Sequence, residues 1–175
     1  AWSIDAAQKS GVFDRIIVST DDEEIAEVAR HYGAEVPFMR PEDLSNDYAG
    51  TIPVIRHATD WLISHDCVVD YVCCIYATAP FIRAEDIIQG LGTLQMQQGD
   101  YAFTVSRFPY PIQRALKVSD EQRISMFSPD MFHVRSQDLE ESWHDAGQFY
   151  WGTSSAWLNE KPIFSADSYS IELPR

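Results

Sequence analysis

Long apolar runs are absent from the sequence, which nowhere approaches the roughly 18 residues that a membrane-spanning helix needs. No basic segment followed by an apolar stretch opens the chain, so we expect neither a secretory signal nor a membrane partner. Positive charge is also scarce, with 13 Lys and Arg against 27 Asp and Glu and a net charge of −14. Such a surface repels phosphate backbones, so we expect no nucleic-acid partner. An anionic substrate would need local Arg side chains or a metal ion.

Cysteine is rare, and the three cysteines form no recognisable framework. Cys73 and Cys74 are neighbours in an apolar run, where successive strand side chains point to opposite faces, so they are poorly placed for a disulfide or a shared metal. Buried thiols in a reducing cytoplasm fit this pattern best. The sequence also has no zinc-ligand spacing, no G-x-x-x-x-G-K-[ST] loop, no G-x-G-x-x-G fingerprint and no G-x-S-x-G elbow.

The first forty residues predict a strand, a helix and a second short strand. Residues 15–20 form a continuous β-branched run, typical of a parallel strand that is covered on both faces. Residues 21–24 supply a helix cap and an acidic first turn, and Gly33 ends the helix. Residues 35–38 form a short strand or edge segment. The helical repeat predicts a buried face made of Ile25, Val28, Ala29 and Tyr32.

The alternation of strands and helices continues as far as residue 106. We expect a helix over Thr51–His65, a buried strand over Asp70–Tyr76, a helix that starts at Ala84 and a strand over Tyr101–Ser106. Strands alternating with helices of 10–15 residues predict the α/β class with a mostly parallel sheet. The 175 residues have the length of one domain.

The pattern changes after Arg107. Residues 116–118 and 124–126 flank a polar turn and predict a hairpin, and two later runs, 149–151 and 169–173, predict strands. We expect residues 108–145 to leave the sheet as a lid or dimerisation arm of a single domain over residues 1–175. The chain begins without Met, inside an expected helix, and we expect it to be truncated at both ends.

Polar loops that follow the expected strands are the candidate functional segments, because ligands of open α/β sheets bind beyond the carboxyl ends of the strands. Residues 19–22 suit a helix cap as well as a site. The loop after Arg40 suits an anion or base clamp, or a surface loop that caps a helix. Arg135 is either solvated or functional, and residues 144–148 form either a pocket-lining turn or a β-turn before a core strand.

Four of these segments occur in an order that resembles the acylneuraminate cytidylyltransferases, the CMP-sugar synthetases that activate nonulosonic acids. The ordered segments are Val18-Ser19-Thr20-Asp21-Asp22-Glu23-Glu24-Ile25-Ala26, Arg40-Pro41-x-x-Leu44-Ser45-x-Asp47, Ala77-Thr78-Ala79-Pro80-Phe81 and His144-Asp145-Ala146-Gly147-Gln148-Phe149-Tyr150-Trp151. The resemblance covers nearly the whole chain. The last segment, with Arg135-Ser136-Gln137-Asp138-Leu139 before it, is most similar to the branch that activates pseudaminic acid.

The resemblance implies a Rossmann-like nucleotidyltransferase sheet flanked by helices, and a reaction in which a nine-carbon sugar acid attacks the α-phosphate of CTP with the help of Mg²⁺. It also implies a homodimer. Three residues match nucleotide-binding positions: Arg40 beside the cytosine, Ala49 through its backbone, and Thr51 through its hydroxyl. Six match sugar-binding positions: Tyr76, Thr78, Gln113, Arg135, Gln148 and Tyr150.

Tyr76 departs from the family pattern, because many relatives have Gln there, and this departure favours a sugar other than simple sialic acid. Arg135 matches an Arg that neutralises the acid end of the sugar from the dimer partner. The catalytic residues stay unknown, since the family's phosphate loop and its metal-binding Asp pair would lie before Ala1 and after Arg175. Alternative hypotheses are N-acetylneuraminic or legionaminic acid as the substrate, a nucleotide-binding relative without catalysis, and an acidic scaffold.

Overall fold

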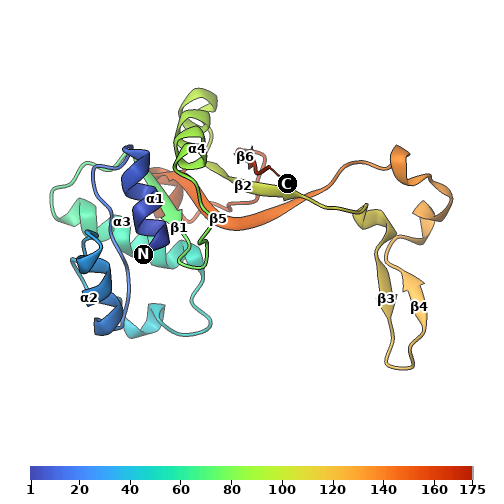
Figure 1. Cartoon of the computed structure of the whole chain (residues 1–175), viewed down its shortest axis with the longest axis horizontal. Coiled ribbons are helices and arrows are strands. Elements are labelled where there is room, and N and C mark those ends of the chain that lie inside the picture. The colour runs from blue at the N-terminus through green and yellow to red at the C-terminus, as the bar shows by residue number, and fades with distance from the viewer. Residues whose placement is uncertain (175) are drawn as a thin grey trace. The chain divides into compact units, whose positions relative to one another are not determined.

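The computed structural model describes residues 1–174 (Figure 1), and these fall into two compact units. The first unit comprises residues 1–104 and 147–171, and the second comprises residues 105–146 and 172–174. Each unit is described by itself below. No helix of residues 1–174 is long and apolar enough to cross a bilayer.

A four-stranded sheet organises the molecule, with the strand order β1-β5-β2-β6. Its strands are β1 (Tyr71–Ile75), β2 (Tyr101–Arg107), β5 (Trp143–Thr153) and β6 (Ser168–Glu172). β1 and β5 run antiparallel, with Cys74 opposite Tyr150 and Val72 opposite Gly152. A parallel bridge joins Ile17 to Glu35. The α/β class is therefore confirmed, and the sheet is mixed because β5 runs against β1.

The helices of the first unit carry the expected end signals. They are α1 (Trp2–Ser10), α2 (Glu23–His31), α3 (Thr51–Ser64), α4 (Ala84–Gln97), α5 (Ser154–Leu158) and the 3₁₀ turn η1 (Glu42–Leu44). Asp22 caps α2 by accepting a hydrogen bond from Ile25 N–H, as expected. Gly33 follows α2 at φ 84°, a left-handed conformation that costs glycine nothing. α1 packs against α4, and α3 packs against α5.

The core of the first unit lies between α4 and the central strands. Ile87 and Leu94 of α4 are buried with Phe149 and Trp151 of β5. Trp151 Nε1 donates a hydrogen bond to Ile87 O at 2.9 Å, so the largest ring of this core leaves no buried donor unpaired. This contact fixes α4 on β5, the strand that leads to the aromatic residues of the candidate site.

The expectations for residues 15–38 were partly wrong. Residues 15–20 and 35–38 form only the bridge between Ile17 and Glu35 rather than two full strands, because few of their backbone groups pair with each other. The buried face of α2 also differs from the expected one. Ala26 and Ala29 are buried, whereas Ile25, Val28 and Tyr32 stay about half exposed. Small side chains thus face the core and let α2 approach closely.

The second unit contains the predicted hairpin, β3 (Leu116–Val118) paired antiparallel with β4 (Ile124–Met126). Three 3₁₀ turns accompany it: η2 (Ile112–Arg114), η3 (Pro129–His133) and η4 (Ser136–Asp138). Large apolar side chains of the hairpin stay exposed, among them Leu116, Val118 and Ile124.

Candidate functional site

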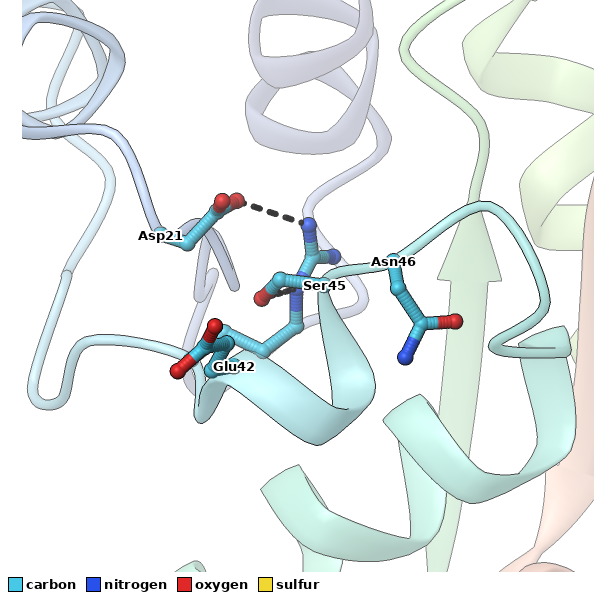
Figure 2. Close-up of a pocket in the computed structure, with 5 residues that line it drawn as sticks. Asp21, Glu42, Ser45 and Asn46 are labelled. Carbon is cyan, nitrogen blue, oxygen red and sulfur yellow. Dashed lines mark hydrogen bonds and ion pairs between the residues drawn. The ribbon is translucent and has the colours of Figure 1, made fainter.

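Arg40 is the centre of a polar hollow in the first unit. Its guanidinium hydrogen-bonds to both Ser45 and Asp21, two of the residues labelled in Figure 2. Nε donates to Ser45 Oγ at 3.1 Å, Nη2 donates to Asp21 Oδ1 at 3.1 Å, and Nη1 reaches Ser19 O at 3.5 Å. The contacts with Asp21 and Ser19 tie the loop that begins at Arg40 to the segment that follows the Ile17 bridge, and the contact with Ser45 lies within the loop. Glu42 and Asn46 complete the lining of the hollow.

The loop from Asn46 to Thr51 is a tight turn that leads directly into α3. Asn46 Oδ1 accepts from Tyr48 N–H at 2.9 Å, and Ala49 N–H donates to Asn46 O at 3.1 Å. The Ala49 N–H is therefore used by the turn, so only the carbonyl of Ala49 is left to contact a ligand through the backbone. Gly50 precedes α3 without a side-chain cap, so the first N–H groups of the helix keep their hydrogen-bonding capacity.

Thr51 and Tyr76, one predicted for the nucleotide and one for the sugar, lie in direct contact. Thr51 Oγ1 and Tyr76 Oη are 2.6 Å apart, a distance typical of an O–H···O hydrogen bond. The Tyr76 ring also packs against Tyr150, with ring centroids 5.3 Å apart. The start of α3, the end of β1 and the strand β5 thus bring three predicted site residues together.

Gln148 lies beside this cluster. Its carbonyl accepts the Tyr76 N–H at 2.9 Å, which places Gln148 opposite Tyr76 across the β1–β5 pair. Gln148 Oε1 is buried and has no hydrogen-bond partner among the described residues. Thr78 lies two residues after Tyr76 in the exposed loop before α4. The first unit therefore carries seven of the nine predicted site residues.

Gln113 and Arg135 belong to the second unit. Gln113 Nε2 donates to Glu140 O at 3.1 Å, while its Oε1 is buried without a partner in the part of the chain that the structure describes. Arg135 is largely exposed, and its Nε donates to Asp138 Oδ2 at 2.7 Å. Their roles toward the sugar stay predictions.

Sequence reasoning missed the contact that fixes Tyr76 from the other side. Ser3 Oγ of α1 donates to Tyr76 O at 3.1 Å, across 73 positions of sequence. No local pattern signals such a pair. The role of Asp21 as the ionic partner of Arg40 was also missed, although both motifs were recognised.

The described residues do not form a metal centre. Residues 1–174 contain no group of three or more His, Cys, Asp or Glu side chains placed to hold a metal ion. The candidate site offers hydroxyl, amide, aromatic and guanidinium groups, together with the carboxylates of Asp21 and Glu42.

Comparison with known proteins assigns the chain to a protein family. The family model described as cytidylyltransferase matches residues 1–146, and the chain belongs to this family of nucleotidyltransferase enzymes. It is 43% identical over 175 residues to the pseudaminic acid cytidylyltransferase of Campylobacter jejuni serotype O:2, covering all of this chain and 75% of that protein. It is 32% identical over 174 residues to a Helicobacter pylori protein named as both a pseudaminic acid cytidylyltransferase and a hydrolase, covering 99% of this chain and 33% of that protein.

Solved structures agree with the fold. The CMP:2-keto-3-deoxy-manno-octonic acid synthetase complexed with CTP superposes with a TM-score of 0.62 at 12% identity, covering 98% of this chain and 79% of that one. The 4-diphosphocytidyl-2C-methyl-D-erythritol synthase from Anaerococcus prevotii gives a TM-score of 0.62 at 10% identity, covering 97% and 74%. At these identities the likeness establishes the nucleotidyltransferase fold.

Proposed function

We propose that this chain activates pseudaminic acid, transferring the cytidylyl group of CTP to the sugar acid and releasing pyrophosphate. The observation that carries the proposal is the Thr51–Tyr76 hydroxyl pair, which joins the loop assigned to the nucleotide to the strand end assigned to the sugar. The full-length similarity to a pseudaminic acid cytidylyltransferase supports the choice of sugar. The three free thiols fit work in a reducing cytoplasm.

In this reaction the anomeric hydroxyl oxygen of the sugar acid attacks the α-phosphorus of CTP in line. The bond from that phosphorus to the bridging oxygen breaks, pyrophosphate leaves, and the hydroxyl proton is released. Catalysis of this kind depends on positioning and on neutralising charge. We assign nucleotide positioning to Arg40, Ala49 and Thr51. Sugar positioning falls to Tyr76, Thr78, Gln148 and Tyr150 in the first unit and to Gln113 and Arg135 in the second.

We also propose that the reaction requires Mg²⁺, which would offset the charge of the triphosphate on this acidic protein. The described residues offer no metal-binding group, so we assign no ligand and derive no step through the ion. Removal of divalent metal by EDTA should abolish pyrophosphate release, and added Mg²⁺ should restore it. Unchanged activity in EDTA would contradict the requirement.

A second copy of this chain is the proposed partner of the β3–β4 hairpin. A two-stranded hairpin is marginal in water by itself, and this one exposes Leu116, Val118 and Ile124. Size-exclusion chromatography with light scattering should therefore report a homodimer. Arg135→Ala should raise the KM for the sugar acid, since we assign this Arg to the sugar of the partner. A fully active monomer would contradict the arrangement.

Pyrophosphate release by the full-length protein with CTP and Mg²⁺ tests the function directly. Pseudaminic, N-acetylneuraminic and legionaminic acids are offered in parallel, and we expect release with pseudaminic acid alone. Arg40→Ala should raise the KM for CTP, with circular dichroism to confirm folding. Release with another acid would reject the proposed sugar and keep the chemistry. No release from a folded protein would favour a relative without catalysis.

Legionaminic acid is the second candidate substrate. The chain is 30% identical over 174 residues to a CMP-N,N′-diacetyllegionaminic acid synthase of Legionella pneumophila, covering 94% of this chain and 71% of that protein. The identity is lower than with the pseudaminic acid enzyme, so the latter sugar is preferred.

A further inference from the structure

We infer that Arg114, in the second unit, binds the carboxylate of the sugar acid and makes the enzyme prefer the acid over an uncharged derivative. The inference rests on the proposed function, because that function makes a sugar acid the substrate. It adds a binding residue that none of the recognised motifs contains. The observation behind it is a buried guanidinium nitrogen that has no partner.

Arg114 differs from the other basic residues of this acidic protein. Most Lys and Arg side chains form an ion pair with a carboxylate. Among residues 1–174, only Arg114, Lys117 and Arg123 form no such pair. Lys117 and Arg123 are exposed to solvent, whereas Arg114 is half-buried. Water can solvate the charge of the first two, but it solvates the charge of Arg114 only in part.

The guanidinium of Arg114 is held in place without being neutralised. Nη2 donates a hydrogen bond to Val134 O, and Nε is buried with no hydrogen-bond partner in the described part of the chain. The Arg114 N–H donates to Pro111 O at 3.0 Å, so the turn η2 fixes the start of the side chain. A carbonyl oxygen offsets little of a full positive charge. Because a buried cation without a carboxylate is costly, this arrangement favours the binding of an anion.

Arg135, the other arginine that we assign to the sugar, already has a carboxylate partner. Its Nε donates to Asp138 Oδ2 at 2.7 Å, and its side chain is 72% exposed. The charge of Asp138 offsets that of Arg135, and water screens what remains. Arg114 has no carboxylate partner and less contact with water. An incoming carboxylate therefore gains more from Arg114 than from Arg135.

Gln113 provides an acceptor in the same turn. Its Nε2 donates to Glu140 O at 3.1 Å, and its Oε1 is buried with no partner among residues 1–174. The turn η2 thus contains one unpaired donor and one unpaired acceptor. In the ring form of a nonulosonic acid, the carboxylate and the anomeric hydroxyl share one carbon, so this ligand offers an acceptor group beside a donor group. The match favours the sugar acid over a simple anion.

The charge of the carboxylate is what Arg114 recognises. Hydrogen bonds between a guanidinium and a carboxylate are charge-assisted and about twice as strong as neutral ones. A carboxamide has nearly the same shape but no charge. Replacing the carboxylate by a carboxamide should therefore weaken binding about 10- to 100-fold, the effect of losing a hydrogen bond between charged groups.

Kinetics of pyrophosphate release by the full-length protein test the inference. The KM of the sugar acid is compared with the KM of its carboxamide, which we expect to be about 10- to 100-fold higher in the wild type. Arg114→Met should raise the KM of the acid until the two values agree within about 3-fold, with the KM of CTP unchanged. Arg114→Lys keeps the charge and should keep part of the preference. Arg123→Met is the matched control, since it removes one positive charge from an exposed position of the same unit, and it should leave the preference unchanged.

Arg135→Ala separates the roles of the two arginines. We expect it to raise the KM of the acid and of the carboxamide by similar factors, because Asp138 already offsets the charge of Arg135. A preference for the acid that survives in Arg114→Met, or one that disappears in Arg135→Ala, overturns the inference. Should Arg114→Met fail to fold by circular dichroism, Arg114→Lys decides, and a preference equal to that of the wild type overturns the inference.

Two outcomes separate this inference from the proposed function. Equal KM values for the acid and the carboxamide in the wild type overturn the role of Arg114 and leave the proposed function standing. No pyrophosphate release by a folded wild-type protein with any of the sugar acids overturns both. Light scattering on Arg114→Met is the further check. A changed oligomeric state with an unchanged preference would assign Arg114 to an interface between copies of the chain and overturn its role in substrate binding.

Discussion

Gly152 of β5 occupies a position where the core has no room for a side chain, and Gly152→Ala tests this packing. A methyl group there would lie 2.5 Å from Trp157 Nε1 and 2.7 Å from Tyr101 Cδ1. Both rings are fully buried, and they already meet edge to face at 5.0 Å between centroids. Trp157 Nε1 also donates to Val72 O at 3.1 Å, opposite Gly152. The indole cannot retreat without weakening that bond.

The cost follows from two effects. Overpacking a well-filled core costs about 1–3 kcal/mol, and a strained or lost hydrogen bond adds about 1 kcal/mol. The sum, about 2–4 kcal/mol, corresponds to a fall in Tm of about 5–15 °C for a chain of this size. Gly92→Ala is the matched control. Gly92 lies inside α4 with nothing within 4 Å of an added methyl group. Alanine there should raise stability by about 0.5–1 kcal/mol through helix propensity.

Thermal and urea unfolding, followed by far-ultraviolet circular dichroism, compares the two variants with the wild type. Opposite shifts of the unfolding midpoint, down for Gly152→Ala and up for Gly92→Ala, are the expected result. An unchanged midpoint for Gly152→Ala would show that the Trp157 and Tyr101 rings move aside freely. That outcome would refute the close packing of α5 and β2 against β5.

Two further predictions concern titrating groups. Arg15 donates a hydrogen bond to Glu35 and lowers the pKa of that carboxyl. The pair therefore stabilises the folded protein at pH values above the pKa of Glu35 in the unfolded chain. This stabilisation is lost as the pH falls through the lower pKa of Glu35 in the folded protein. In urea unfolding near pH 7, Glu35→Gln should lower the free energy of unfolding by at most about 0.5 kcal/mol, because the pair is exposed. Near pH 2 the substitution should have no effect. An equal loss of stability at both pH values would contradict an ionic contribution from this pair. Burial raises the pKa of Cys74 to about 12, so at pH 8 a disulfide reagent such as DTNB should label Cys67 in the native protein and the strand thiols only after unfolding. Equal labelling rates in the native state would contradict this burial.

The helices were predictable where the end signals and the packing agree. α3 starts at Thr51 as expected, and α4 starts at Ala84 with an acidic first turn. The position of α2 was predicted, but its buried face was predicted wrongly. The helical periodicity assigns Ile25 and Val28 to the core, whereas the helix packs closely through its buried alanines. Residues 15–20 were predicted to form a strand because their composition suits one. A strand also needs a neighbouring strand to pair with, and composition does not show whether one is present.

The candidate site was predictable as a set of positions and unpredictable as a set of contacts. Ordered motifs named Thr51 and Tyr76 separately, 25 residues apart, and nothing in either motif indicates that their hydroxyls meet. The same holds for Ser3, whose contact with Tyr76 spans 73 positions. Contacts of this range are made by the tertiary fold, which local spacing does not encode.

Arg40 shows how such contacts refine a role that a motif only suggests. Three N–H groups of its guanidinium are committed to Ser45, Asp21 and Ser19, which leaves two of the five for a ligand. The nearby Asp21 carboxylate offsets the positive charge of the Arg40 guanidinium. The remaining N–H groups therefore act on a ligand as oriented hydrogen-bond donors more than through net positive charge. Such donors suit the carbonyl oxygen of a nucleobase better than a phosphate, whose charge would be opposed by Asp21. The ion pair therefore supports the assignment of Arg40 to the cytosine end of CTP, and it implies that the triphosphate is neutralised by other groups.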